Sequence, residues 1–383
     1  MKKYVLRLFF FLIPVLIFMG IPAFIFWWTG ENFISESRIK EIQKSEKSLI
    51  GYFYNESNYR ALKKISIEEM PANDILVLGS SRVTQFRDFM FKSPSFNCGY
   101  TISTITQVKD YLESMPEDKI PTVLLLGLDQ WMFNANWDQV DLQSGADFFD
   151  PKSVKISFEP NPKQFWSFWK DLIANKTFYK GSMRDQNSSN GKLIGLNANF
   201  FQMGFRPDGS FNYGNRINGI LAFDPHVKDF GFQDTFERIE KGLYRFEYGQ
   251  QVNPKALIAF EELVIYCRKE KIRLIAFLPP FAPSVVRKLQ NSGNHQYIQL
   301  LPELLLKYAT PNEVEIWDFT DIENLGSSDQ EFLDGFHAGE VSDLRILIQM
   351  VENKSLVGDF TDLQEMKNLI KKRKNQLELK SEK

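Results

Sequence analysis

Cysteine and histidine are scarce in this chain of 383 residues, which contains two cysteines and three histidines. No CxxC pair and no cluster of cysteine and histidine has the spacing of a zinc site, so the sequence predicts no metal centre. Nothing supports a disulfide between the distant Cys98 and Cys267, and cysteine often serves as a small buried apolar side chain. The few histidines also limit the chemistry, because an enzyme that uses an imidazole base must use one of the three.

An excess of charge of either sign is also missing. The 46 basic residues nearly balance the 48 acidic ones, for a net charge of -2. Domains that bind nucleic acid carry a basic patch or stripe, so we expect no nucleic-acid partner. Core material is ample, with 43% hydrophobic and 14% aromatic residues. At roughly 100–200 residues per domain, the chain has room for one large or two small domains.

Charge is absent from Leu8–Trp28. An apolar run of this length crosses about 30 Å of hydrocarbon as a helix. Lys2, Lys3 and Arg7 precede the run, and such positive charges stay in the cytoplasm. A cleaved signal peptide is the alternative, but the run is long for one and no small-x-small cleavage site follows it. We predict that residues 1–30 are a cytoplasmic N-terminus and a transmembrane anchor, with the main domain periplasmic or extracellular.

Beyond the anchor, short apolar runs alternate with helix-like segments. This alternation predicts an α/β fold whose parallel sheet is covered by helices on both faces. Chemistry in such sheets sits at the carboxyl ends of the strands. Helices are predicted over Ile102–Met115 and from Asn253 onward. The predicted strands lie within Asp74–Arg82, Ser95–Gly99, Thr122–Asp129, Ile272–Pro280 and Val314–Phe319.

Domain boundaries follow from the same pattern. Residues 31–72 are charged and helix-like, and we interpret them as a stalk that leads to an α/β domain over residues 73–355. Residues from about 130 to 252 lack the strand–helix rhythm and are rich in aromatics, Gly and Asn, so we interpret them as an insertion beside the active site. Its stretch Phe165–Lys170 either packs into a core, as such aromatics more often do, or binds sugars, the membrane or a partner. Residues 356–383 are interpreted as a basic helical tail, with Lys371–Lys374 in solvent.

His337 is the strongest candidate for a catalytic base. It lies three residues after Asp334, so a turn can bring the carboxylate to the second ring nitrogen, where it fixes the tautomer. His226 also follows an aspartate but lies in the insertion, and His295 has no carboxylate nearby. An isolated Asp-x-x-His is more often a surface turn than a site, since short motifs have a high false-positive risk.

Ser81 is the candidate nucleophile. It follows the first predicted strand and enters a turn, which exposes its hydroxyl above the sheet and turns its N–H toward a bound oxyanion. A serine in a lone Gly-Ser-Ser more commonly caps a helix. The interpretation as a nucleophile therefore depends on what else the sequence places at the strand ends.

Four short blocks occur in order at the ends of the predicted strands and near the C-terminus. They are Gly79-Ser80-Ser81, Gly99, Gly127-Leu128-Asp129-Gln130 and Asp334-x-x-His337. In order and placement they resemble the SGNH/GDSL hydrolase superfamily over residues 73–128 and 253–350. The resemblance implies a three-layer, flavodoxin-like parallel sheet, with Ser81, Asp334 and His337 as a triad and the N–H groups of Ser81 and Gly99 as oxyanion donors. It implies no cofactor and no metal.

Two positions depart from the family pattern. Ser80 stands where the family has Asp, and Asp129 stands where it has an Asn that donates to the oxyanion. An ionised carboxylate cannot donate. Either Asp129 is protonated, or Gln130 or Asn134 substitutes for it, or only backbone donors serve the oxyanion.

A Gly-Ser-Ser block behind a membrane anchor is also similar to the subgroup that works beside membrane-bound O-acyltransferases in alginate acetylation and lipoteichoic acid D-alanylation. That similarity implies acyl transfer to, or ester hydrolysis on, an envelope polysaccharide or polymer, with the membrane and a membrane-bound O-acyltransferase as partners. The alternative is a non-catalytic scaffold or polysaccharide-binding subunit on the same fold. Arg82, next to the nucleophile, either holds a substrate phosphate or carboxylate or forms a salt bridge with a nearby acid.

Overall fold

The computed structural model describes residues 2–32, 34–44, 47–137, 161–174, 192–311 and 313–380. These residues form two compact units. The first unit is built from the described parts of residues 1–61, 155–207 and 211–215, and the second from those of residues 62–154, 208–210 and 216–383. The predicted insertion is therefore divided: one part belongs to the first unit, another to the second, and residues 138–160 and 175–191 lie outside the described residues.

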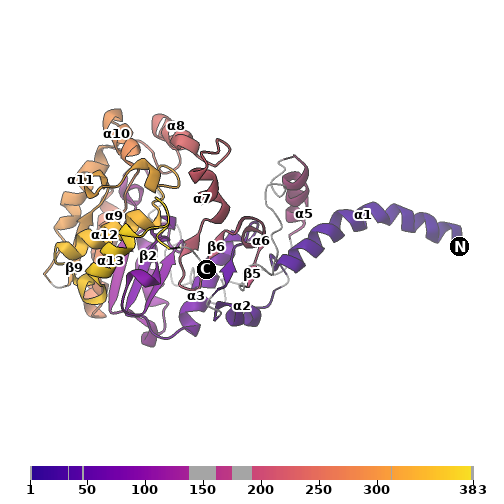
Figure 1. The fold of residues 1–383 in the computed structure, drawn as a ribbon, viewed down its shortest axis with the longest axis horizontal. Coiled ribbons are helices and arrows are strands. Elements are labelled where there is room, and N and C mark those ends of the chain that lie inside the picture. Colours follow the sequence, from indigo (N-terminus) through magenta and orange to yellow (C-terminus); the bar gives the residue numbers. More distant parts are fainter. Residues whose placement is uncertain are drawn as a thin grey trace. The chain divides into compact units, whose positions relative to one another are not determined.

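The second unit contains a five-stranded parallel sheet (Figure 1). Each predicted strand is present and each pairs in parallel, in the order β3-β2-β4-β8-β9. This confirms the α/β class and the parallel sheet. The strands are β2 (Ile75–Gly79), β3 (Ser95–Gly99), β4 (Val123–Gly127), β8 (Arg273–Leu278) and β9 (Val314–Asp318).

Apolar residues cover both faces of this sheet. Successive strand side chains point to opposite faces, so Val77 belongs to one core cluster and Leu78 to the other. The first cluster includes side chains from α10 (Pro283–Ser292), α12 (Glu340–Glu352) and α13 (Leu363–Lys371). The second includes α4 (Thr106–Glu113), α9 (Pro254–Lys269) and α11 (Gln296–Leu306), and it buries the free thiols of Cys98 and Cys267.

Three further described α-helices lie wholly or mainly in the second unit. They are α3 (Tyr59–Glu69), α7 (Gly214–Leu221) and α8 (Gln233–Lys241). The predicted start of α9 is observed, since the Asn253 side chain accepts the Lys255 N–H and Pro254 occupies the first turn.

The C-terminal segment is part of the α/β core rather than a free tail. Lys371–Lys374 are exposed, as expected, but the chain then folds back and buries Leu377 and Leu379. The Leu379 N–H donates to Oε2 of Glu340 at 2.9 Å, and the Glu340 N–H donates to the Leu377 carbonyl at 2.9 Å. These contacts hold the last described residues against the start of α12.

Residues 31–72 do not form the stalk that the sequence predicted. The described residues up to 61 belong to the small first unit, and residues 62–72 belong to the second. Two-residue strands form a sheet in the order β5-β1-β6-β7, so residues 49–50 lie in a sheet rather than in a helix. Strands this short leave no periodicity that a sequence can show. The strands are β1 (Leu49–Ile50), β5 (Leu193–Ile194), β6 (Gly204–Phe205) and β7 (Phe211–Asn212), and the helices are α1 (Lys2–Thr29), α2 (Glu36–Gln43), α5 (Pro162–Trp169) and α6 (Leu196–Phe201).

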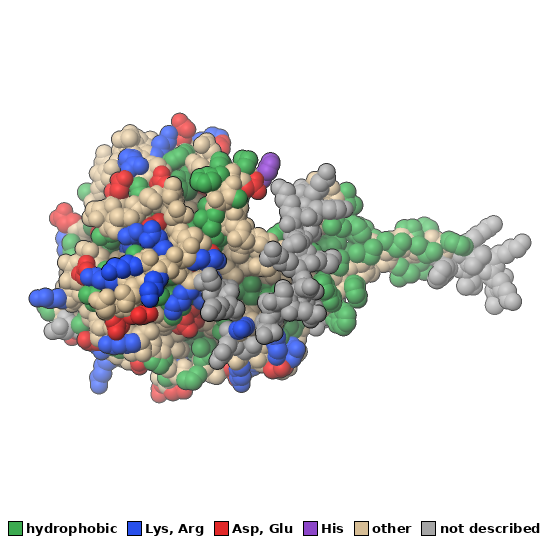
Figure 2. Space-filling view, viewed as in Figure 1, with side chains coloured by type: hydrophobic (Ala, Val, Ile, Leu, Met, Phe, Trp, Pro, Cys, Tyr) green, Lys and Arg blue, Asp and Glu red, His purple; other side chains and the backbone are tan. Residues whose placement is uncertain are grey.

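Helix α1 is long and apolar enough over Phe10–Thr29 to cross a membrane, and Figure 2 shows apolar side chains along it. The aromatic stretch in α5 packs against this helix. Phe165 and Phe168 lie 5.8 and 5.6 Å from the Phe26 ring, and the Trp169 indole donates to the Phe18 carbonyl. Phe165 and Phe168 of the stretch are therefore core residues, whereas Trp166 of the same stretch is 68% exposed.

Candidate active site

Ser81 lies immediately beyond the carboxyl end of β2. The strand ends at Gly79, and Ser81 opens a short 3-10 helix whose Arg82 N–H is capped by the Ser80 hydroxyl at 3.2 Å. Val83 packs where β2 and β4 end. A Cβ at Gly79 would lie 2.9 Å from the Val83 side chain, and one at Gly127 only 2.3 Å away. The glycines of the two blocks thus let the chain turn closely over the sheet and present Ser81.

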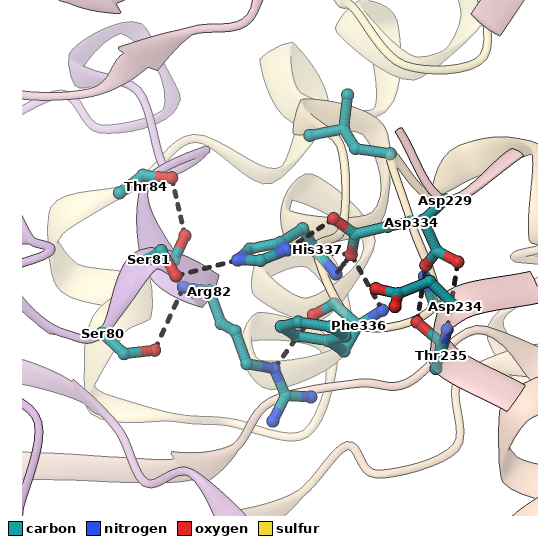
Figure 3. A network of polar contacts seen from close by, with 12 residues as sticks. Ser80, Ser81, Arg82, Thr84, Asp229, Asp234, Thr235, Asp334, Phe336 and His337 are labelled. Carbon is teal, nitrogen blue, oxygen red and sulfur yellow. Dashed lines mark hydrogen bonds and ion pairs between the residues drawn. The ribbon is translucent and has the colours of Figure 1, made fainter. Parts of the chain in front are cut away.

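The structure brings the three predicted triad residues together (Figure 3). Ser81 Oγ lies 2.8 Å from Nε2 of His337, although the two residues are 256 positions apart. His337 Nδ1 lies 2.8 and 2.9 Å from the two oxygens of Asp334. The hydroxyl can donate to Nε2 while Nδ1–H donates to the carboxylate, which is the arrangement of a nucleophile, a base and a group that orients the base.

Asp334 is buried but well supplied with donors. The backbone N–H groups of Phe336 and His337 donate to Oδ1 at 3.2 and 2.9 Å, and Nη2 of Arg216 donates to Oδ2 at 2.8 Å. Burial acts to raise the pKa of Asp334, but His337 and Arg216 outweigh it and hold that pKa well below its ordinary value. Asp334 is therefore ionised at any pH at which a histidine could act as a base.

The turn that carries Asp334 and His337 is held by residues of the insertion that the sequence did not identify. Asp229 accepts the Gly335 N–H at 3.3 Å and also binds the Thr235 backbone and hydroxyl at 3.0 and 2.5 Å. A Cβ at Gly335 would lie 2.4 Å from Thr235, so the turn fits closely against the start of α8. Asp229, Thr235 and Arg216 carry no local motif, and Arg216 lies 118 positions before its partner.

Arg82 is buried and bonds to several other groups of the protein, so it is not placed to contact a substrate. Its residue is only 2% exposed. Nη1 lies 3.4 Å from Asp129 Oδ1 and 2.7 Å from Gln130 Oε1, and Nε donates to the Phe336 carbonyl at 3.0 Å. Nη2 donates to the carbonyls of Pro279 and Pro280. The geometry corrects the assignment to substrate binding and supports the salt bridge that was its alternative.

The expected oxyanion donors are only partly available. The Ser81 N–H has no acceptor among the described residues. The Gly99 N–H, by contrast, donates to Oδ1 of Asn97 at 2.8 Å, so its assignment to the oxyanion does not hold in this geometry. Both amide substitutes are engaged as well: Gln130 Nε2 donates to Pro279 and Asn134 Nδ2 to Glu247, each through a backbone carbonyl.

Asp129 is the remaining side chain from the third block. It is 1% exposed, and its Oδ2 has no hydrogen-bond partner within the described residues. Burial raises the pKa of Asp129, while Arg82 and Ser80 act in the opposite direction. Burial also lowers the pKa of Arg82 to about 10, despite the nearby carboxylate. A protonated Asp129 would carry an O–H able to donate, so this alternative from the sequence stays open.

The other two histidines lie apart from this constellation. His226 is exposed, and its backbone N–H donates to Asp224. His295 is buried, with Nδ1 3.0 Å from the Ser292 hydroxyl and Nε2 2.9 Å from the Phe246 carbonyl. Neither histidine has a serine and a carboxylate on its two ring nitrogens within the described residues, as His337 has.

Among the described residues, no group of three or more His, Cys, Asp or Glu side chains is placed to hold a metal ion. No protein-family model matches the chain, and no curated protein matches it at a significant level.

Proposed function

We propose that this chain is a membrane-anchored serine esterase or O-acyltransferase of SGNH type, acting outside the cytoplasm on a cell-envelope polysaccharide or polymer. The observation that carries the proposal is the unbroken line of contacts from Ser81 Oγ through the His337 ring to Asp334. A structural serine needs no such line, whereas a nucleophile needs a base and the base needs an ionised acceptor.

The first half of the reaction forms an acyl-enzyme. Ser81 Oγ attacks the carbonyl carbon of an ester as its proton moves to Nε2 of His337. Asp334 stabilises the imidazolium through Nδ1–H, and the Ser81 N–H donates to the oxygen of the tetrahedral intermediate. Collapse of that intermediate breaks the ester bond, and His337 returns the proton to the departing alcohol.

The second half releases the acyl group. His337 takes a proton from an incoming hydroxyl as that hydroxyl attacks the acyl-Ser81 carbonyl. The bond between Ser81 Oγ and the acyl carbon then breaks, and His337 returns the proton to Oγ, which restores the free serine. Water as the attacking group gives hydrolysis, while a sugar or polymer hydroxyl gives transfer. An apolar helix that fits a membrane favours transfer, because it keeps the domain beside acyl groups delivered through a membrane-bound O-acyltransferase.

The experiment uses the full chain in detergent with p-nitrophenyl acetate as donor. We expect slow release of p-nitrophenol, lost in Ser81→Ala, and acetylated sugar by mass spectrometry when an envelope glycan is added. Fast hydrolysis that no glycan changes would indicate a plain esterase. A folded wild-type protein without Ser81-dependent turnover of any ester would instead favour the non-catalytic scaffold. The Gly99 N–H, which donates to Asn97 and not toward an oxyanion, is an observation on the side of that alternative.

Orientation needs its own test. With Lys2, Lys3 and Arg7 on the cytoplasmic side, the chain beyond Gly30 should be outside. A phosphatase reporter, which is active only outside the cytoplasm, fused after residue 60 should therefore be active. Activity of a cytoplasm-only reporter at the same position would overturn the orientation.

A further inference from the structure

Arg245 lies on a strained stretch of backbone and contacts an aromatic ring, Trp131, that Arg82 also contacts. After α8 ends, Tyr244 and Arg245 both have positive φ, at 50° and 78°. Non-glycine residues rarely adopt this region, and such strain is kept where the surrounding structure fixes it, often at binding sites. Here the fixing contacts are the Arg245 N–H to Glu247 at 3.2 Å and the buried Phe246, whose ring lies 5.8 Å from that of Phe336.

The Arg245 guanidinium lies over Trp131, with Cζ 5.1 Å from the ring centroid. Trp131 is 2% exposed, and its ring centroid lies 6.3 Å from that of Phe336. The ring centroids of Phe336 and His337 are 4.4 Å apart. Arg82, the residue after the nucleophile, lies over the same Trp131 ring at 5.2 Å. Two aromatic rings therefore connect Arg245 to the catalytic base.

Charge balance distinguishes Arg245 from the other two arginines near the site. Arg82 pairs with Asp129, and Arg216 pairs with Asp334. Arg245 is exposed, and within the described part of the chain its guanidinium forms no ion pair and no hydrogen bond, although its charge acts on the buried Asp129. Stacking on Trp131 uses the face of the guanidinium and leaves its N–H edges free.

We propose that Arg245 binds an anionic group, a phosphate or a carboxylate, on the substrate that reaches Ser81. The planar guanidinium matches either oxyanion with two parallel hydrogen bonds. This inference rests on the proposed function for its location, and it narrows the substrate class to an anionic donor or acceptor. A phosphodiester polymer and a uronic-acid polymer share this chemistry.

A binding experiment tests Arg245 without turnover. The probes are sn-glycerol 3-phosphate and glucuronate, titrated by calorimetry into full-length Ser81→Ala protein. Adding Arg245→Gln should weaken binding about 10-fold to 100-fold, the range for a charge-assisted hydrogen bond. Arg245→Lys should recover part of the affinity, because it keeps the charge but not the fork. The probe that binds more tightly indicates the polymer class.

The matched control is Arg287→Gln, which removes one positive charge from an exposed pair with Glu323. It should leave both affinities unchanged. Circular dichroism and the urea midpoint should show that each variant is folded. If neither anion binds, or if a folded Arg245→Gln protein binds both as well as its parent, the inference is wrong.

Turnover separates this inference from the proposed function. In the protein with Ser81 intact, Arg245→Gln should lower the ratio of kcat/KM for an anionic ester to that for p-nitrophenyl acetate by about 10-fold to 100-fold. Anion binding that depends on Arg245, in a protein without Ser81-dependent turnover, would support the anion site and refute the enzyme. Turnover with no change in that ratio would refute the anion site alone.

Discussion

Asp334 and Asp129 are two buried aspartates of the same unit, each beside an arginine, yet their environments favour opposite charge states. Asp334 accepts hydrogen bonds from Arg216, His337 and Phe336, and its pKa is held low. Asp129 has one arginine nitrogen at 3.4 Å, a contact with Ser80 and one oxygen that has no partner among the described residues, and burial raises its pKa.

The difference shows that the number and placement of hydrogen-bond donors and positive charges around its oxygens, rather than burial alone, decide the charge of a buried carboxyl. Desolvation penalises both carboxylates, and only hydrogen bonds and opposite charges aimed at the oxygens can offset it. Asp334 has the charge that an imidazole base requires. Asp129 is suited to the opposite task, because a protonated carboxyl can donate.

The same substitution at the two aspartates should have very different effects. Asp334→Asn should lower kcat for ester turnover by roughly 10⁴-fold, because the amide no longer fixes the imidazole tautomer. Stopped assays with p-nitrophenyl acetate over hours give the range needed. Asp359→Asn is the control, since Asp359 is exposed in a surface pair with Arg273, and it should have wild-type activity. A loss of less than about tenfold at Asp334 would contradict the triad.

Removing a donor from Asp334 should make it resemble Asp129. We expect Arg216→Gln to lower kcat by about 10-fold to 100-fold and the free energy of unfolding by about 1.5–3 kcal/mol at pH 7. In the wild type, the low pKa of Asp334 stabilises the folded protein at pH values above the pKa that this carboxyl has in the unfolded chain. That stability is lost as the pH falls through the pKa of the folded state. The gap between variant and wild type should therefore shrink as the pH falls below the ordinary value of 3.8.

Urea unfolding of both proteins at pH 7 and pH 3 measures this effect, with activity followed in parallel. Arg287→Gln is again the control, because Arg287 pairs with Glu323 and not with Asp334. The difference in its free energy of unfolding from the wild type should not depend on pH in this way. A gap that is equal at the two pH values would mean that Arg216 acts by packing and not through the charge of Asp334.

Asp129→Asn should have the smallest effect. The amide keeps an oxygen for Arg82 and gains N–H donors, so kcat/KM should be retained or rise. Because folded Asp129 holds its proton more tightly than the unfolded chain, wild-type stability should fall as the pH rises from the ordinary value of 3.8 through the raised pKa. Asn does not titrate, so the free energy of unfolding of the variant, measured with urea, should rise relative to that of the wild type as the pH increases over this range. A large loss of activity would show that the carboxylate itself has a role.

The sequence predicted correctly those parts of the fold that can be recognised from residues adjacent in the chain. The three central strands of the parallel sheet are short apolar runs such as Val123–Gly127, because a strand buried on both faces needs no polar alternation. The outer strands β3 and β9 include polar residues such as Asn97 and Glu315. The small sheet of the first unit was missed since its strands have two residues each. The C-terminal tail was judged from its basic stretch, whereas Leu377 and Leu379 fix its place.

At the candidate site, the sequence predicted the three residues that the structure brings together but not those that support them. Ser81 stands out through its place directly after a strand, and His337 through the aspartate three residues before it. The roles of Arg82 and the Gly99 N–H depend on where acceptors lie in space, namely Asp129 and Asn97, and no spacing along the chain encodes this. The supporting residues of the insertion, Arg216 above all, act across long separations for the same reason.

The central claim is that His337, oriented by Asp334, activates Ser81 as a nucleophile. Its most direct test is the reaction of the full-length protein with a fluorophosphonate, followed by intact mass and peptide mapping. We predict one covalent adduct, located on Ser81, absent from Ser81→Ala and formed far more slowly in His337→Ala. A folded wild-type protein that forms no adduct, or an adduct that persists in Ser81→Ala, would contradict the account.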